Sequence, residues 1–276
     1  MSEEKKRSEL PKHWKTNSWE EKARENPLFA VMTTADMADA DPVEFSPQHL
    51  QLFFEKGRRL AERFVTAWLP RVPEQGLVVE YGCGAGRILN ALVERGIVCA
   101  GIDISPTMLR HCARLVPGVH SLHPLDEAGR CSLPDGCARL VFSHAVLQHI
   151  DSLSIYEGAL SEMCRLLMTG ASLIVQLNCE DYALKSGDQL GTTDNFEQYS
   201  VHKPSFGGES YVHRHSTWSG VYIGRERLAR TLLASGVHIL EVQSFNPDKP
   251  RSILIHAWKP AAAVDGNGDP VSTGRT

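Results

Sequence analysis

Long apolar runs are missing from this sequence of 276 residues. A helix that spans a bilayer needs roughly 20 consecutive apolar residues, and no stretch approaches that length. The opening residues, MSEEKKR, are mostly charged and lack the apolar stretch of a secretion signal. These absences argue against an integral membrane protein, and they predict a cytoplasmic chain without a membrane partner.

A surplus of basic residues is missing as well. Lys and Arg number 29 against 33 Asp and Glu, which gives a formal net charge of -4. Nucleic acids bind basic surfaces, so they are not an expected partner. With 42% hydrophobic residues, a chain of this length can bury a full core, which excludes global disorder.

Cysteine pairs with the spacing of a zinc or redox site are also absent. The seven cysteines are an odd number and lie in scattered apolar segments, at positions 83, 99, 112, 131, 137, 164 and 179. No C-x-x-C pair occurs among them. We therefore predict buried reduced thiols rather than a disulfide framework, and no resident metal.

Alternating strand and helix patterns occupy the middle of the chain. Short apolar runs predict strands at 77–81, 98–103, 119–122, 139–143 and 171–177. Helical periods lie between them, near 86–95, 106–115 and 153–168. A further helix at 224–235 precedes apolar runs at 237–245 and 252–258, which predict an antiparallel pair of strands. This order predicts a doubly wound α/β sheet.

The segment before this pattern has two parts. Residues 1–47 are charged and have few apolar anchors, which predicts an arm or lid rather than a domain. From Gln48 to Leu69 apolar residues recur at helical spacing, and Pro70 and Pro73 are expected to end that helix.

The remaining segments lack a regular pattern. Residues 180–222 are rich in glycine, polar and aromatic residues, and an irregular stretch of that length inside a domain is usually functional. We therefore expect one domain over residues 48–260 with an insertion at 180–222. Residues 261–276 have no core-forming content and predict a disordered tail.

The most informative segment is LVVEYGCGAGR, in which an apolar strand ends in Glu80 and enters glycines at 82, 84 and 86. Such a turn lets the backbone approach a ligand, and the next helix offers free N–H groups. The dinucleotide fingerprint G-x-G-x-x-G needs glycine where this chain has Arg87, which argues against an NAD or FAD enzyme. A P-loop also fails, because no Gly-Lys-Ser/Thr follows. A tight structural turn is the alternative.

A second acid ends the next predicted strand. Asp103 closes the run VCAGID and lies 17 positions beyond Gly86. In nucleotide-binding sheets an acid at this place accepts hydrogen bonds from ribose hydroxyls. A carboxylate that only caps the following helix is the alternative.

These two motifs and three later ones resemble class I S-adenosylmethionine-dependent methyltransferases, in particular those with an E/D-x-G-x-G-x-G motif that act on small molecules. The later motifs are Leu133-Pro-Asp-Gly136, Ser143-x-x-Val-Leu-x-His149-Ile and the run from Leu160 to Gly170. The resemblance implies a Rossmann-like, doubly wound sheet of seven strands with the last strand antiparallel, an N-terminal helical lid, and S-adenosylmethionine across the carboxyl ends of the strands.

The resemblance also implies which residues contact the cofactor. Those at the methionine part would be Glu80, Gly82, Gly84, Gly86, Arg87 and Ser143. Those at the ribose and adenine would be Asp103, Ile104 and Met108. Arg87 as a plain helix-surface residue is the alternative for that position.

The chain departs from the family pattern at the adenine end. Family members often carry an acid a few residues before the Leu-Pro pair, whereas this chain has GRCS at 129–132. The adenine contacts would then come from the backbone around Cys131.

Two histidines are candidates for a catalytic base. Methyl transfer needs an acceptor lone pair held in line with the methyl group, and a base helps when the acceptor is a hydroxyl or a protonated amine. His144 and His149 flank the loop after the fourth predicted strand, and histidine suits proton transfer at pH 7. In similar small-molecule methyltransferases a histidine near the position of His149 serves as base or orients the acceptor. Structural roles are the alternative for both.

The arm and the insertion supply candidate acceptor-binding residues. An insertion after the fifth strand would pass over the cofactor pocket, where aromatic side chains beside polar groups suit a flat acceptor. The candidates are Trp19, Tyr199, His202, Tyr211, His213, His215 and Trp218. His213 and His215 would face one way on a strand, as metal ligands can, but no third ligand is evident. A packed surface loop is the alternative.

The sequence thus predicts an enzyme that transfers a methyl group from S-adenosylmethionine to an O or N atom of a small-molecule metabolite, in a biosynthetic tailoring step. A non-catalytic S-adenosylmethionine-binding sensor or scaffold is the alternative, because an intact turn indicates binding rather than turnover. An RNA methyltransferase is a third reading, which the net charge disfavours. The identity of the acceptor and the choice between a monomer and a homodimer stay open.

Overall fold

A computed structural model describes the chain over residues 17–32, 44–179, 211–215, 218–246 and 249–260. The predicted tail at 261–276 and most of the predicted insertion lie outside these described residues. The domain bounds predicted from the sequence stay predictions.

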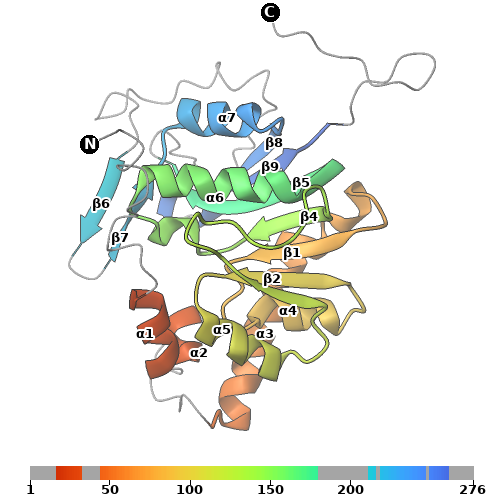
Figure 1. Ribbon diagram of the computed structural model, residues 1–276, viewed down its shortest axis with the longest axis vertical. Coiled ribbons are helices and arrows are strands. Elements are labelled where there is room, and N and C mark those ends of the chain that lie inside the picture. Colours follow the sequence, from red (N-terminus) through yellow and green to blue (C-terminus); the bar gives the residue numbers. More distant parts are fainter. Residues whose placement is uncertain (1–16, 33–43, 180–210, 216–217, 247–248, 261–276) are drawn as a thin grey trace, which may run out of the picture.

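A seven-stranded sheet forms the centre of the fold (Figure 1). Its strands are β1 (Leu77–Tyr81), β2 (Cys99–Asp103), β3 (Ser121–Pro124), β4 (Ala138–Ser143), β5 (Leu167–Asn178), β8 (His238–Asn246) and β9 (Lys249–Trp258). Their spatial order is β3-β2-β1-β4-β5-β9-β8, with β1 to β5 parallel and β9 antiparallel to both neighbours. The predicted sheet is confirmed. Its order reverses between β1 and β4, where open α/β sheets bind ligands at the carboxyl ends of the strands.

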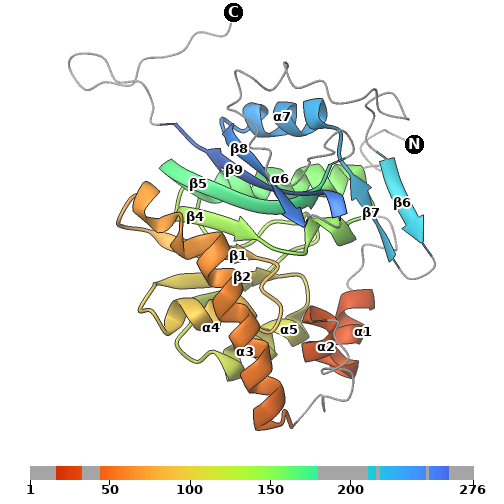
Figure 2. The ribbon, with the colours of Figure 1, turned by 180° about the vertical axis from the view of Figure 1, so that it is seen from behind.

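Helices cover both faces of this sheet (Figures 1 and 2). On one face lie α3 (Pro47–Ala61), α4 (Arg87–Val93) and α5 (Pro106–Leu115), and on the other lie α6 (Leu153–Leu166) and α7 (Arg225–Ala234). Neighbouring strand residues alternate between the two cores: Val78 belongs to the same apolar cluster as Ile88, and Val79 to the same cluster as Met163. Burial on both faces is the reason why the strands have continuous apolar sequences.

The helix predicted over Gln48–Leu69 differs in its second half. α3 ends at Ala61, and the chain continues as a π-helical turn η4 (Glu62–Thr66) and a 3-10 turn η5 (Leu69–Arg71). The N–H of Ala67 donates to the carbonyl oxygen of Glu62, five residues back, at 3.3 Å. The apolar period does not reveal this change, because a wider turn still buries Phe64.

The described part of the arm consists of α1 (Asn17–Glu25) and α2 (Pro27–Val31), which we call the lid. These residues are helical, and their action as a lid stays a prediction. Leu28 and Met32 pack in one apolar cluster with Ala85 of the glycine turn and Met108 of α5. The lid therefore lies against the edge of the sheet that carries the predicted site.

An antiparallel hairpin occupies the end of the insertion, where the sequence predicted no regular structure. It consists of β6 (Tyr211–His215) and β7 (Trp218–Tyr222). The N–H of Val221 donates to the carbonyl oxygen of Ile150 at 2.8 Å, which places β7 beside the 3-10 turn η6 (Leu147–His149). In both views the hairpin and the lid lie on the same side of the molecule (Figures 1 and 2). The mixed polar and aromatic composition concealed these short strands.

Two further predictions concern the whole fold. All seven cysteines are free thiols, and six of them are buried, as predicted. Within the described residues, no helix is both long enough and apolar enough to cross a membrane.

Candidate functional site

The glycine turn connects β1 to α4 where the strand order reverses. Gly82 and Gly84 have positive φ angles of 80° and 52°. A Cβ atom on Gly82 would lie 2.2 Å from Cγ2 of Val146, and one on Gly84 would lie 2.7 Å from Cγ2 of Val31. Only glycine allows this backbone and this close approach together. The turn is therefore enclosed by the lid and by residues 144–152, which we call the post-β4 loop.

Glu80 and Arg87 are two buried charged residues at the ends of this turn. The Glu80 carboxylate accepts a hydrogen bond from the N–H of Leu89 in α4, but its Oε2 has no hydrogen-bond partner in the described part of the chain. The same holds among those residues for Nε of Arg87. Burial raises the pKa of Glu80 well above its usual range, and the charge of Arg87 opposes that shift.

Buried polar atoms are usually paired, so these two atoms indicate a place for a ligand. A carboxylate suits an ammonium group, and a guanidinium suits a carboxylate. Glu80 and Arg87 therefore fit the amino-acid end of a ligand such as S-adenosylmethionine.

Asp103 ends β2 and joins the glycine turn to α5. Its Oδ2 accepts a hydrogen bond from the N–H of Gly84 at 2.8 Å, and its Oδ1 accepts one from the N–H of Ser105 at 2.9 Å. Burial raises the pKa of Asp103, although these backbone hydrogen bonds lower it. Asp103 thus fixes the turn before α5, whose N-cap is Ser105. The carboxylate still has lone pairs that could accept from a hydroxyl donor.

The other predicted cofactor residues come from the same edge of the sheet. The hydroxyl of Ser143, at the end of β4, donates to the carbonyl oxygen of Tyr81 at 2.9 Å. Met108 is buried against the lid, and Ile104 between β2 and α5 is half-buried. The predicted residues from three strands therefore meet at one edge.

Glu20 fastens the lid to α5, a role that the sequence analysis missed. Its carboxylate accepts hydrogen bonds from the Ser105 hydroxyl at 2.6 Å, from the Thr107 N–H at 3.2 Å and from the Thr107 hydroxyl. Ser105 is the N-cap of α5, where a negative charge is favourable. No sequence signal links Glu20 to residues more than 80 positions away. Glu20 thus closes the lid beside Asp103.

The docking of the lid is expected to weaken in acid. Burial alone would raise the pKa of Glu20, but the hydrogen bonds from Ser105, Thr107 and Arg24 lower it to about 2 from 4.5. A lowered carboxyl pKa stabilises docking above pH 4.5, and this stabilisation is lost as the pH falls from 4.5 to about 2. Hydrogen exchange of the α1 amides should therefore accelerate over that range.

Glu20→Gln is expected to reproduce this loosening at neutral pH. Trypsin cleavage after Lys22 and Arg24 should accelerate on the order of tenfold, because hydrogen bonds to charged groups contribute roughly 1.5–3 kcal/mol and less when partly exposed. Glu21→Gln, on the exposed side of the same helix, is the matched control and should leave the rate unchanged. Equal cleavage of the two variants would exclude Glu20 as the fastening residue.

His149, the first candidate for a base, lies against the lid. The rings of Trp19 and His149 pack edge to face, with centroids 5.1 Å apart. Lys22 Nζ lies 4.6 Å from the centroid of the Trp19 ring. Burial, followed by the charge of Lys22, lowers the pKa of His149 to about 4, so the imidazole is neutral at pH 7. The structure thus brings together the predicted acceptor residue Trp19 and the predicted base.

His144, the second candidate, has different neighbours. Its ring packs against Phe64 of η4 at 5.0 Å and against Phe245 of β8 at 5.6 Å between centroids. Burial and the charges of Arg87 and Arg63 lower its pKa to about 3. His144 therefore lies among aromatic rings and near Arg87, and its role as a base stays a prediction.

The candidates in the insertion are placed only in part. Tyr199 and His202 lie outside the described residues. Tyr211, His213 and His215 belong to β6 and Trp218 to β7, so backbone register alone is known for them. Within the described residues, no three His, Cys, Asp or Glu side chains form a group that could hold a metal ion.

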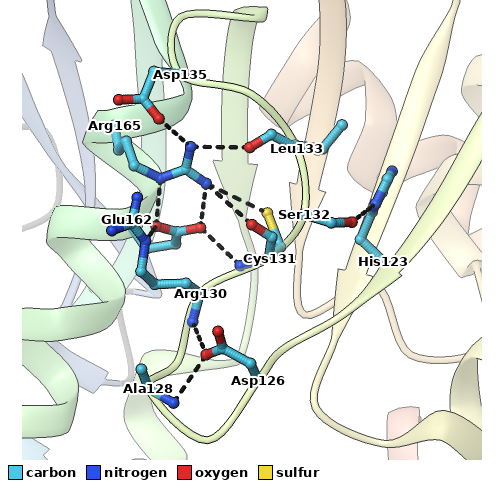
Figure 3. A network of polar contacts seen from close by, with 10 residues as sticks. All are labelled: His123, Asp126, Ala128, Arg130, Cys131, Ser132, Leu133, Asp135, Glu162 and Arg165. Carbon is cyan, nitrogen blue, oxygen red and sulfur yellow. Dashed lines mark hydrogen bonds and ion pairs between the residues drawn. The ribbon is translucent and has the colours of Figure 1, made fainter.

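A polar network fixes the segment after β3 to helix α6 (Figure 3). Arg165 contacts Glu162 through Nε at 2.7 Å and through Nη2 at 2.6 Å, and its Nη1 donates to Asp135 and to the carbonyl oxygen of Leu133. Glu162 Oε1 also accepts the N–H of Cys131 at 2.9 Å. The sequence signal for this network is an acid and a base three residues apart in one helix.

This network bears on the adenine contacts expected from the backbone at Cys131. The N–H of Cys131 is held by Glu162, and its carbonyl oxygen accepts a hydrogen bond from Arg165 at 3.4 Å. Both groups are therefore directed to α6 (Figure 3). The backbone of Cys131 is a support for this edge rather than a free donor to adenine.

Comparisons with known proteins agree with this geometry. Residues 79–175 match the family model of a methyltransferase domain. No curated protein matches the chain. Among solved structures, a methyltransferase dependent on S-adenosylmethionine from Methanosarcina mazei is 18% identical with a TM-score of 0.52, over 71% of this chain and 98% of that chain. The CcbJ methyltransferase from Streptomyces caelestis is 16% identical with a TM-score of 0.50, over 75% and 90% of the two chains.

A third similar structure is the glycopeptide N-methyltransferase MtfA in complex with S-adenosylmethionine. It is 16% identical with a TM-score of 0.50, over 75% of this chain and 94% of that chain. At these identities the structures show a shared fold, and the matched domain adds the family. The chain therefore contains a methyltransferase domain with the fold of S-adenosylmethionine-dependent methyltransferases, and S-adenosylmethionine is its methyl donor.

Proposed function

We propose that the protein methylates an O or N atom of a small-molecule metabolite, as a tailoring step in a biosynthetic pathway. The observation that carries this proposal is the contact between Trp19 of the lid and His149 of the post-β4 loop. An aromatic ring and a neutral imidazole together suit a flat acceptor with a polar atom. A lid that closes on the site also excludes water from the reaction.

The hairpin gives a second reason for an acceptor site at this end of the molecule. β7 is hydrogen-bonded to the residue that follows η6, so the hairpin lies next to His149. We propose that its residues and Trp19 bind the acceptor, that His149 orients it or accepts its proton, and that His144 is structural. The net charge of -4 favours a metabolite over nucleic acid.

We assign the cofactor contacts to the residues at the edge formed by β1, β2 and β4. Glu80 and Arg87 would hold the amino-acid end of the cofactor, and the glycine turn would leave room for it. Asp103 would accept hydrogen bonds from the ribose hydroxyls. The same site would include Ile104, Met108 and Ser143. The bound cofactor supplies an electrophilic methyl group on a sulfonium. The chain's own residues orient the acceptor and exclude water, which accounts for much of the rate in such displacements.

Nitrogen and oxygen remain alternative acceptor atoms. MtfA is a glycopeptide N-methyltransferase by name, and it shares the fold with this chain. Fold analogy does not transfer a substrate, so the acceptor must be found by experiment.

Calorimetry with S-adenosylmethionine and S-adenosylhomocysteine is the first test, with NAD as the control. We expect binding of the first two and none of NAD. Purified protein would then be incubated with S-adenosylmethionine and a panel of phenols, alcohols and amines, with S-adenosylhomocysteine as the measured product. If the protein binds S-adenosylmethionine but forms no S-adenosylhomocysteine with any compound of the panel or with RNA, the sensor or scaffold alternative is supported. Turnover on RNA alone would overturn the small-molecule proposal.

Asp103→Ala should weaken the binding of S-adenosylmethionine by about tenfold or more, since hydrogen bonds to charged groups contribute about 1.5–3 kcal/mol. It should also lower the free energy of unfolding, because the buried N–H groups of Gly84 and Ser105 lose their acceptor. Calorimetry and urea unfolding measure the two effects.

Asp126→Ala is the matched control for this variant. The Asp126 carboxylate likewise accepts two backbone N–H groups, those of Ala128 and Arg130, each at 2.9 Å, but in an exposed turn. Cofactor affinity should be unchanged in this control. Wild-type affinity in folded Asp103→Ala would remove Asp103 from the ribose role.

A further inference from the structure

A chain of amide side chains runs from the centre of the sheet to His149. Gln176 of β5 is only 2% exposed, and its Oε1 accepts a hydrogen bond from the N–H of Ala145 at 2.8 Å. Its Nε2 lies 3.2 Å from Oε1 of Gln148 and 2.9 Å from the hydroxyl of Ser252. The Nε2 of Gln148 in turn lies 3.2 Å from Nε2 of His149.

The direction of every hydrogen bond in this chain follows from its first member. A backbone N–H can only donate, so the atom of Gln176 that faces Ala145 is the carbonyl oxygen. The NH₂ group of Gln176 must then donate to Gln148, which turns the Gln148 oxygen toward β5. The NH₂ group of Gln148 therefore faces His149 and donates to it, because an amide nitrogen does not accept.

The backbone of Ala145 is a second reason to expect that the turn carrying Gln148 and His149 is held in one conformation. Its φ angle is 59°, and no other described residue except glycine has a positive φ. A non-glycine residue in this conformation is strained, so surrounding contacts must stabilise it. The hydrogen bond to Gln176 is such a contact, and Ala145 leads directly into the turn that carries Gln148 and His149.

We propose that Gln176 is a positioning residue that acts through Gln148 to hold His149 as the neutral tautomer with its proton on Nδ1 and an engaged lone pair on Nε2. This inference rests on the proposed role of His149 at the acceptor site. It deepens that role, because a ring held in this way carries its proton on Nδ1 and uses the Nε2 lone pair to accept from Gln148. An N–H donor orients an acceptor oxygen, such as that of a phenolate or an alcohol, which keeps a second lone pair for the bond to the methyl group.

The tautomer can be read directly in the protein without cofactor or acceptor. Long-range proton–nitrogen correlation spectra of nitrogen-15-labelled protein at pH 7.5 distinguish a protonated ring nitrogen from an unprotonated one. His149→Gln identifies the signals by their loss. We expect a protonated Nδ1 and an unprotonated Nε2. A protonated Nε2 in the wild-type protein would overturn the proposal.

Two variants test the direction of the chain. Gln148→Glu replaces the donor that faces His149 with an acceptor at a half-buried position, so Nε2 of His149 should become protonated. Gln176→Leu removes the group that orients Gln148, so the preference for the Nδ1 proton should be lost. An unchanged His149 spectrum in either variant would contradict the proposal.

Gln243→Leu is the matched control for Gln176→Leu. Gln243 lies on β8 and donates from Nε2 to Glu241 at 2.6 Å, without contact to this chain of amides. Its substitution should leave the His149 signals unchanged. These spectra use no substrate, so a failed acceptor screen and a failed tautomer prediction are separate results.

Discussion

Arg165→Ala should lower the free energy of unfolding by about 3–5 kcal/mol, the usual cost of removing one partner from a buried ion pair. The Arg165 and Glu162 side chains are 14% and 3% exposed. Without the guanidinium, the Glu162 carboxylate would remain buried with Arg130 at 3.7 Å as its nearest charge, on an exposed side chain. The carbonyl oxygens of Cys131 and Leu133 would lose a donor as well. Urea unfolding measures this loss.

Arg227→Ala provides the matched control. Arg227 contacts Glu157 through the same two atoms, Nε at 2.7 Å and Nη2 at 3.1 Å. These side chains are 47% and 27% exposed, however, so water replaces the lost partner. The expected cost is about 0–1 kcal/mol. Equal losses for the two variants would show that burial of Glu162 does not govern the effect.

Gly57→Ala should be at least as damaging, with a loss of roughly 3 kcal/mol or more, because overpacking costs typically 1–3 kcal/mol and more when backbone must move. A Cβ atom on Gly57 would lie 1.9 Å from the carbonyl oxygen and 2.8 Å from the carbonyl carbon of Arg87. Separation of α3 from α4 would also displace Arg87 from the glycine turn. We therefore expect weaker S-adenosylmethionine binding together with a lower unfolding midpoint.

Gly158→Ala isolates this steric effect from helix propensity. Gly158 lies within α6 on an exposed surface, and a Cβ atom there would meet nothing within 4 Å. Alanine is preferred over glycine in helices by about 0.8–1.0 kcal/mol, so this variant should be slightly more stable than the wild type. If Gly57→Ala also raised the free energy of unfolding, that result would contradict the close contact of α3 with α4.

Most of the fold could be predicted because its signals are local. The helix predicted over 106–115 has those bounds in the structure, since Ser105 caps it and Pro106 suits its first turn. The apolar runs marked the sheet, because strands covered on both faces are mostly apolar. The π-helical turn after α3 and the β6–β7 hairpin were missed, because neither has a distinct apolar period.

The candidate site likewise has residues that the sequence could identify and residues that it could not. Glu80, the glycines and Asp103 could be recognised because they follow strands at a spacing that the family resemblance makes specific. The structure brings Trp19 and His149, two candidates chosen from the sequence, into contact and places His144 among aromatic rings; their roles stay predictions. The side chains chosen in the insertion stay predictions.

Local sequence was sufficient for the strands, the glycine turn and the cofactor class, because a turn motif and its flanking apolar runs depend on neighbours along the chain. The fastening of the lid by Glu20, the support of Cys131 by α6 and the orientation of His149 by Gln176 were decided only by tertiary structure. Each joins residues about 30 or more positions apart. The donors and acceptors that satisfy a buried polar group are set by packing, and no local pattern records which distant partner packing will bring.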